Sequence, residues 1–280
     1  MKTTTLPSIN FLASTAFERL SRLAGICFTS GNVKRLASTL ALVALPAGNA
    51  LSDDVSSKQL KLIELYTSHG CSSCPPADEL LGKLLSEDEH LLALEFHVDY
   101  WDNLVHGSDG NFVDPFSDAS YSRRQRTYNV AELQGRPGVY TPQAIVNGRY
   151  AAVGTNRKHI SRALATPVEQ SLDIRITEGP TPDTLSVDIT GSAGQLDALV
   201  GTDISVAHYL DEATTLITGG ENRHKSLTNH HIVRSMTRLG EVTVGAAMTF
   251  SIEKPAGDAG CVVLVQEDAL TPVFAAQGCP

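Results

Sequence analysis

The sequence has few of the features that mark several large classes of protein. Its apolar runs fall short of the roughly twenty residues that a transmembrane helix needs, so we expect no stable membrane span. Basic residues number 22 against 31 acidic ones, and the resulting net charge of −9 disfavours nucleic acid and anionic lipid as partners. Only five cysteines occur in 280 residues, and a single C-x-x-C motif leaves no second pair to complete a four-cysteine zinc site.

The N-terminal region has the pattern of an export signal. A mostly apolar run at residues 36–45 follows Lys34 and Arg35 and precedes the small residues at 46–50. Because a signal peptidase recognises this order of charge, apolar segment and small residues, we expect residues 1–50 to be removed by cleavage after Ala50. The protein would then be exported to the periplasm or the extracellular space.

The residues before Lys34 make a poor signal sequence, since they are a mixture rich in serine, threonine and phenylalanine. We interpret them as an upstream over-extension, because initiation at Val33, which a GTG codon would encode, gives a compact signal. The alternative is a long but genuine leader that begins at Met1. Cleavage removes Cys27, five basic residues and one acidic residue, which leaves four cysteines and a net charge of −13. An even number of cysteines suits an oxidising compartment.

The C-x-x-C motif, Cys71 and Cys74, follows an apolar segment at residues 60–66 and opens a helical pattern. Unpaired N–H groups and the positive end of the dipole at a helix start favour the thiolate, which is the nucleophile of thiol–disulfide exchange. Pro75 and Pro76 suit a first helical turn, which needs no N–H from them. We therefore predict a helix that begins at Cys71 and a redox-active pair in which Cys71 attacks and Cys74 resolves.

The same two cysteines allow other assignments. Half of a zinc site and a purely structural disulfide have the same spacing. His69 lies two residues before Cys71, and His97 ends a predicted strand, so neutral imidazoles could join Cys71 and Cys74 around copper or zinc. A periplasmic copper-handling protein is therefore one alternative.

A second motif lies about seventy residues after the first. Residues 139–150 form the pattern of a loop with Thr141 and Pro142, a short apolar strand, an Asn147-Gly148 turn and a returning strand. This placement resembles the cis-proline loop of the thioredoxin superfamily, in which the proline lies against the active-site sulfurs. The resemblance implies a cis bond at Pro142, whereas the alternative is an ordinary proline at a strand entry.

The two motifs and their surroundings resemble one family, the secreted bacterial thioredoxin-like proteins known as domain of unknown function 1223. The resemblance covers nearly the whole exported chain and implies a thioredoxin-like fold joined to a β-rich domain, but it implies no substrate. The segments that carry it are ELYTS at 64–68, GCSSCPPAD at 70–78, HVDYWD at 97–102, DPF at 114–116, RQR at 124–126, YTPQ at 140–143, VNG at 146–148, GEN at 220–222 and VR at 233–234.

The expected fold class is an α/β thioredoxin-like domain followed by a mainly antiparallel, sandwich-like β domain. With 42% hydrophobic and 19% charged residues, the chain is long enough for two hydrophobic cores. Residues 51–168 alternate strand and helix patterns, which favours a sheet with helices on both faces. Residues 169–280 change to short alternating runs, for example at 172–176 and 185–189, which is typical of a β-sandwich.

The two remaining cysteines, Cys261 and Cys279, lie in strand-like segments on either side of a turn near Leu270. Reflection about that turn places them opposite each other, within range of a structural disulfide. The alternative is a free Cys279 at a frayed chain end.

Glu64 is the candidate proton acceptor for the resolving thiol, because it lies in the strand before the cysteines. The alternative is a structural carboxylate held by a basic or backbone partner. Arg123, Arg124 and Arg126 are most simply a solvated helix face, although the family resemblance also singles out Arg124 and Arg126.

Tyr100 and Trp101 are candidates for the wall of a substrate groove, or else they cap the sheet, as large aromatic side chains often do. His230 and His231 are adjacent in a strand pattern, so their side chains point to opposite faces. We therefore assign the two histidines to strand and loop surface and not to a metal site.

Together these features predict an exported enzyme, a thiol–disulfide oxidoreductase with the Cys71–Cys74 disulfide and no other cofactor. Its partners would be protein or small-molecule thiols and disulfides, held by backbone contacts of Thr141 and Pro142. The direction of electron flow is left open. Besides copper handling, the second alternative is a non-enzymatic binding protein on a thioredoxin-like scaffold.

Overall fold

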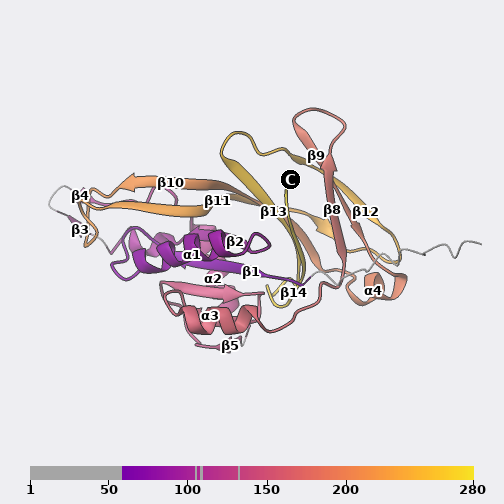
Figure 1. The fold of residues 1–280 in the computed structure, drawn as a ribbon, viewed down its shortest axis with the longest axis horizontal. Helices are drawn as coiled ribbons and strands as arrows, with labels where there is room; N and C mark the ends of the chain where they lie inside the picture. Colours follow the sequence, from indigo (N-terminus) through magenta and orange to yellow (C-terminus); the bar gives the residue numbers. More distant parts are fainter. Residues whose placement is uncertain (1–58, 105, 108–109, 132) are drawn as a thin grey trace, which may run out of the picture. The chain divides into compact units, whose positions relative to one another are not determined.

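The computed structural model describes residues 59–104, 106–107, 110–131 and 133–280. The predicted export signal at residues 1–50, its cleavage site and the alternative start at Val33 lie outside the described residues. The described part combines helices with a large β-sheet and consists mostly of strands (Figure 1). None of the helices described there is long and apolar enough to cross a membrane.

Nine strands form one mixed sheet in the order β14-β13-β10-β11-β2-β1-β6-β7-β5. β1 and β2 are parallel, whereas β6 pairs antiparallel with β1, and β10 pairs antiparallel with both β11 and β13. The register places Ile232 of β11 opposite Glu95 of β2, so strands from both sides of the predicted boundary at residue 168 belong to one sheet. The bounds of the nine strands are β1 Leu62–Thr67, β2 Leu92–His97, β5 Gln134–Gly135, β6 Gln143–Val146, β7 Tyr150–Val153, β10 Asp203–Leu216, β11 Ser226–Glu241, β13 Ala259–Gln266 and β14 Val273–Gly278.

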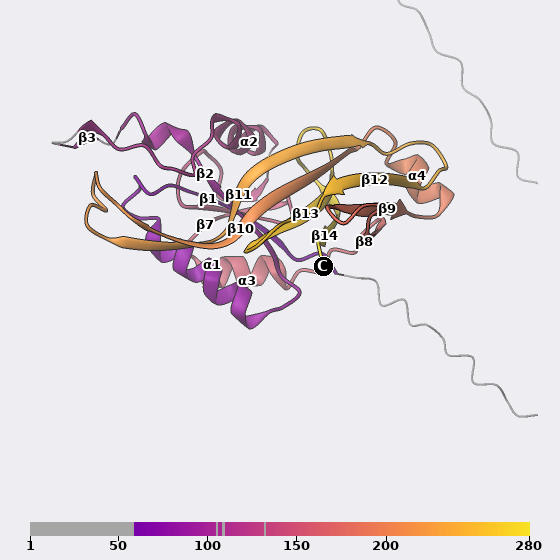
Figure 2. The same ribbon diagram turned by 90° about the horizontal axis from the view of Figure 1, so that it is seen from above.

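Three helices cover the two faces of this sheet around β1. The helices α1 and α3 pack on one face and α2 packs on the other (Figure 2). Alternation along β1 explains the two layers, because Ile63 and Leu65 face α1 and α3 whereas Leu62 and Tyr66 face the side of α2. All six residues of β1 are buried, so this strand is the centre of both layers. The bounds of the helices are α1 Pro75–Glu87, α2 Ala119–Val130 and α3 Arg157–Leu164.

A three-stranded antiparallel sheet, in the order β12-β9-β8, packs on the C-terminal part of the large sheet. The shared core contains Val187 and Ile189 from β9 and Val206 and Val263 from the large sheet, all of them buried. Two sheets that pack face to face through alternate apolar positions make a sandwich-like arrangement. The bounds are β8 Asp173–Glu178, β9 Thr184–Thr190 and β12 Met248–Glu253, and the short helix α4 Ala193–Ala198 follows β9.

The C-terminal end of the chain is attached to the sheet by a disulfide. Cys261 in β13 and Cys279 just after β14 are bonded, with their Cα atoms 5.2 Å apart. The backbone N–H of Cys279 also donates to the carbonyl of Cys261 at 2.8 Å, so the chain end continues the ladder between the two strands.

The insertion after β2, at residues 99–118, has local structure of its own. It contains a 3-10 turn, η1, at Asp99–Trp101 and a two-stranded ladder formed by β3, His106–Gly107, and β4, Gly110–Asn111. The last part of the insertion returns to the sheet, where the backbone N–H of Asp118 donates to the carbonyl of His97 at 3.2 Å. The insertion therefore begins and ends beside the C-terminal end of β2.

Candidate active site

The first candidate residues lie in the turn between β1 and α1. Cys71 and Cys74 form a disulfide with their Cα atoms 5.4 Å apart. Hydrogen bonds from the N–H of Cys71 to the carbonyl of Ser68, 3.1 Å, and from Cys74 to Cys71, 3.2 Å, fold the turn. The helix begins at Pro75 with Cys74 as its N-cap, so the predicted start at Cys71 was wrong. The reason is that the tight turn comes first, and the first full helical bond at this end runs from Asp78 to Cys74.

Asn222, in the loop between β10 and β11, is hydrogen-bonded to this turn. Its Nδ2 donates to the carbonyls of both His69 and Cys71, each at 2.9 Å, and the residue is fully buried. The Nζ of Lys225 donates to the Oδ1 of Asn222 at 2.9 Å, which fixes the orientation of the amide. Both cysteines are buried, and the loop at residues 217–225 is hydrogen-bonded to the disulfide turn through Asn222.

Replacing Asn222 with alanine is expected to speed reduction of the Cys71–Cys74 disulfide by dithiothreitol roughly tenfold. Two hydrogen bonds to the turn are lost, each with a net contribution of about 0.5–1.5 kcal/mol, and the sulfurs become easier to reach. The rate is measured by quenching with acid and counting free thiols. The exposed Asn129 provides the control, because Asn129→Ala should leave the rate unchanged. Equal rates for the wild type and Asn222→Ala would show that this loop does not govern access.

The proline loop lies beside the start of α1. The peptide bond between Thr141 and Pro142 is cis. Gly154 packs between the loop and the helix, because a Cβ added to it would come within 2.9 Å of the Pro142 Cβ and 3.0 Å of the Ala77 Cβ. The N–H of Gly154 also donates to the carbonyl of Pro142 at 2.9 Å. Since Ala77 is in the first turn of α1, the cis-proline loop lies next to the helix start that carries Cys74.

A groove with a volume of about 450 Å³ opens at the proline loop. The two aromatic candidates form part of its wall. Trp101 donates its Nε1–H to the Thr141 Oγ1 at 2.8 Å, and the guanidinium of Arg126 lies over the ring of Tyr100 at 5.9 Å. The groove therefore combines aromatic surface and one cation beside the cis peptide bond. Its lining residues are Tyr100, Trp101, Arg126, Val139, Tyr140 and Thr141.

Glu64 lies on the face of β1 that is turned away from α1, because it shares that face with Tyr66. Arg124 donates to its two carboxylate oxygens at 2.7 and 2.9 Å, and the hydroxyls of Tyr66 and Tyr128 donate at 3.0 and 2.5 Å. This geometry favours the structural alternative for Glu64. The side chain of Arg124 is 9% exposed, so its assignment to a solvated helix face was wrong. A buried carboxylate opposite the arginine is the physical reason.

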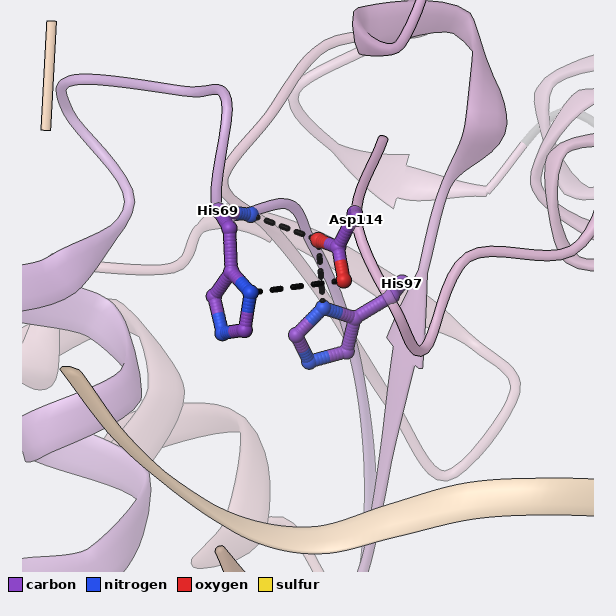
Figure 3. Close-up of side chains that lie close together, drawn as sticks. All are labelled: His69, His97 and Asp114. Carbon is purple, nitrogen blue, oxygen red and sulfur yellow. Dashed lines mark hydrogen bonds and ion pairs between the residues drawn. The ribbon is translucent and has the colours of Figure 1, made fainter. Parts of the chain in front are cut away.

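His69 and His97 lie together, but their shared partner is Asp114 and not the cysteine pair (Figure 3). The Nδ1 of His97 lies 2.8 Å from the Asp114 Oδ2, and the Nδ1 of His69 lies 3.4 Å from the Asp114 Oδ1. All three side chains are fully buried. Burial by itself lowers the pKa of His97, but the carboxylates of Asp114 and Glu95 override it and raise that pKa to about 10. Sequence reasoning missed Asp114, whose signal was its place in the DPF segment.

Asp78 is a buried acid that sequence reasoning did not select. It lies four residues after Cys74 in α1, is 2% exposed, and accepts a hydrogen bond from the Thr67 Oγ1 at 2.7 Å. Burial, followed by the charge of Glu95, raises the pKa of its carboxyl well above the ordinary value. Its spacing from Leu81, three residues later on the buried face of the helix, was the signal that could have revealed it.

The chain can now be compared with known proteins. The family model described as "Protein of unknown function (DUF1223)" matches residues 62–266, which is most of the chain and includes the disulfide turn, the cis-proline loop and the histidine cluster. The chain belongs to the DUF1223 family. This match confirms that the family which the sequence motifs indicated is DUF1223.

Two solved structures resemble this DUF1223 protein. The crystal structure of a protein from Agrobacterium tumefaciens has 28% sequence identity and a TM-score of 0.60, over 78% of this chain and 93% of that chain. HBP35 of Porphyromonas gingivalis has 14% identity and a TM-score of 0.49, over 80% of this chain and 75% of that chain. No curated protein matches the chain.

The remaining histidine pair of the DUF1223 protein has two separate environments. The Nδ1 of His230 lies 3.4 Å from the Glu212 Oε2, whereas the Nδ1–H of His231 donates to the carbonyl of Ala93 at 3.1 Å. The ring of His231 stacks on that of Tyr209, with ring centroids 4.3 Å apart. The two imidazoles therefore lie in different surroundings.

Proposed function

We propose that this protein is an exported thiol–disulfide oxidoreductase built on a thioredoxin-like scaffold. The observation that carries the proposal is the Cys71–Cys74 disulfide, which lies in the turn before α1 and beside the cis bond at Pro142. A β1-α1-β2 unit next to the antiparallel strands β6 and β7, followed by α3, is consistent with the scaffold. Export is consistent with the N-terminal signal pattern and with two disulfides, which persist in oxidising compartments.

Electron transfer runs through a mixed disulfide. In the reduced protein the Cys71 thiolate attacks one sulfur of a partner disulfide, so that a new S–S bond forms and the second partner sulfur leaves as a thiolate. The Cys74 thiolate then attacks the Cys71 sulfur, which restores the internal disulfide and releases the first partner sulfur. Two electrons pass to the partner, and its two thiolates take up protons. The same steps in reverse oxidise a partner dithiol, and the reduction potential of the pair sets the direction.

In this mechanism Asp78, and not Glu64, is the proton acceptor for the resolving thiol. In a helix, side chains four residues apart lie on the same face, so Asp78 lies on the face of α1 that follows from Cys74, and its carboxyl accepts a hydrogen bond from Thr67 at the end of β1. Burial raises the pKa of the Asp78 carboxyl, so its ionised form is a stronger base than an ordinary aspartate. Asp78 would therefore accept the proton of the Cys74 thiol as that sulfur becomes the attacking thiolate.

The groove beside the cis-proline loop is the binding site for the partner. An extended peptide that lies along Thr141 and Pro142 can bind to backbone groups of the loop, and its side chains then meet Tyr100, Trp101 and Arg126. Aromatic walls with few charges suit partners of varied sequence, because stacking and apolar contact place few demands on the side chain. The groove thus favours protein thiols and disulfides as the main substrate class.

The first test is the pH dependence of Cys71 alkylation in the reduced protein, combined with equilibration against reduced and oxidised glutathione. We expect alkylation to continue well below the pKa of about 8.5 of an ordinary thiol, and the pair to cycle reversibly between dithiol and disulfide. The variant Cys261→Ser/Cys279→Ser serves as the control, because it removes the second disulfide and should leave both results unchanged. A pair with ordinary thiol reactivity that does not cycle would refute the redox function.

A further inference from the structure

His69 has one polar atom that the buried network leaves without a hydrogen bond. Its Nε2 lies 2.8 Å from the Oδ1 of Asn229. The Nδ2 of Asn229 donates to the Glu95 Oε1, which fixes the amide so that its oxygen accepts from His69. The proton of the neutral imidazole is therefore on Nε2, and Nδ1 has a free lone pair. Among the described residues this buried Nδ1 has no hydrogen-bond partner.

The lone pair of His69 faces a carboxylate. The Oδ1 of Asp114 lies 3.4 Å from the Nδ1 of His69, and the Oδ2 lies 2.8 Å from the Nδ1 of His97. Two electron-rich atoms that face each other in a buried site repel, and a cation between them would turn the repulsion into attraction. Figure 3 shows one nitrogen of each ring turned toward the carboxylate of Asp114.

We propose that His69, His97 and Asp114 bind one divalent transition-metal cation of the Zn²⁺ type. One ligand atom from each of the three residues lies within 4.8 Å of the other two, and the Nδ1 atoms of both histidines face the oxygens of Asp114. A tetrahedral Zn²⁺ ion with bonds of about 2.0–2.1 Å places neighbouring ligand atoms roughly 3.3 Å apart. The two nitrogen–oxygen distances to Asp114, 3.4 Å from His69 and 2.8 Å from His97, lie on either side of this value. Two imidazoles and a carboxylate suit this cation, and a water molecule or substrate atom would be the fourth ligand. Binding displaces the proton on the Nδ1 of His97, because histidine ligands must be deprotonated.

The Nε2 atoms of both rings have hydrogen-bond partners of the kind that metal-binding histidines have. The Nε2 of His97 lies 3.1 Å from the Glu95 Oε1, and the Nε2 of His69 is bonded to Asn229. A carboxylate or amide oxygen at this position fixes the tautomer and turns the other nitrogen toward the metal. Glu95 is itself held by Asn229 and by the N–H of His230, so the outer partners are fixed too. The ring of Phe116 lies 5.7 Å from that of His69 and 5.3 Å from that of His97, which gives the site an apolar wall.

This site does not use the cysteines, which distinguishes it from a metal site made by Cys71 and Cys74 with the histidines. Both cysteine sulfurs are committed to the disulfide, and the carboxylate of Asp114 provides the third donor. The ion would tie the disulfide turn, through His69, to the end of β2 and to the insertion. Metal binding can therefore be measured independently of dithiol exchange.

The test is calorimetric titration of Zn²⁺ into the untagged protein after chelator treatment, with the Cys71–Cys74 disulfide intact. We expect one equivalent of Zn²⁺ to bind to the wild type and equally to Cys71→Ser/Cys74→Ser. Affinity should fall more than about 100-fold in His69→Gln, which exceeds the 10–100-fold typical for loss of an outer partner. The exposed His159 supplies the control, and His159→Gln should bind like the wild type. Absence of binding by the wild type, or full affinity in a folded His69→Gln, would overturn the proposal.

A Co²⁺ spectrum of the wild-type protein decides the ligand set even if His69→Gln does not fold. Two nitrogens and one oxygen should give the visible bands of a low-coordinate Co²⁺ site without the near-ultraviolet charge transfer that thiolate ligands cause. Thiolate bands that vanish in Cys71→Ser/Cys74→Ser would instead place the metal on the cysteines and overturn the proposal. Dithiol exchange is measured on the same samples, so the loss of one activity is distinguishable from the loss of the other.

Discussion

Arg124→Ala is expected to lower the free energy of unfolding by about 3–5 kcal/mol, because it leaves the buried Glu64 carboxylate without its counter-charge. The guanidinium donates to both carboxylate oxygens of Glu64, and its Nη2 also donates to the Gln266 Oε1 at 2.7 Å. One substitution thus removes a charge and three hydrogen bonds that link β1, α2 and β13. Urea unfolding followed by circular dichroism measures the change, with an unaltered m-value as the sign that the unfolded state is the same.

Two further variants distinguish the contribution of the ion pair to stability from the effect of any substitution in α2. Arg123 is the preceding residue in the same helix and is exposed, so Arg123→Ala should change stability by less than about 0.5 kcal/mol. The double variant Arg124→Met/Glu64→Leu should recover part of the loss, because an apolar pair needs no counter-charge. Recovery stays partial, since the hydroxyls of Tyr66 and Tyr128 lose their acceptor. If Arg124→Ala were no worse than Arg123→Ala, the buried pair would not stabilise the fold.

Local patterns predicted most of the individual elements because they act over a few residues. Asn147 and Gly148 form the turn between β6 and β7 with φ values of 52° and 63°, a left-handed conformation that these two residue types tolerate best. The helix expected to carry Arg123, Arg124 and Arg126 is α2, Ala119–Val130. The pairing of β11 with β2 had no such local signal, because it joins Ile232 to Glu95, which are far apart in the sequence. Sequence periodicity identifies strands but does not select their neighbours.

The residues of the candidate site show the same difference between local signals and contacts between distant parts of the sequence. The spacing of Cys71 and Cys74 is local and indicated the pair that forms the disulfide, whereas the cis bond before Pro142 was implied by the resemblance to the thioredoxin superfamily. Partners of buried polar groups are not local, as the hydrogen bond between His69 and Asn229 shows across 160 positions. A charged residue in a helix is usually exposed, so sequence alone assigns Arg124 to the surface. Only the tertiary fold shows that a buried carboxylate faces it.

Cys74→Ser is expected to trap a mixed disulfide on Cys71, whereas Cys71→Ser should form none. In Cys74→Ser the first attack proceeds, but no second thiolate is present to break the new bond, so the adduct accumulates. In Cys71→Ser the remaining thiol is the N-cap of α1 and is the resolving sulfur in the proposed mechanism. The reduced variants are incubated with oxidised glutathione, quenched with acid and weighed intact by mass spectrometry.

The wild type and a variant that lacks the second disulfide are the controls for this experiment. Reduced wild-type protein should reach the internal disulfide and keep little adduct, because Cys74 displaces glutathione from Cys71 as fast as it binds. Cys261→Ser/Cys279→Ser should behave like the wild type, since that disulfide lies in the ladder between β13 and β14 and takes no part in exchange. One adduct on Cys71→Ser and none on Cys74→Ser would reverse the two roles. No adduct on either variant would make the first disulfide structural, and the position of Cys74 at the start of α1 would then serve folding alone.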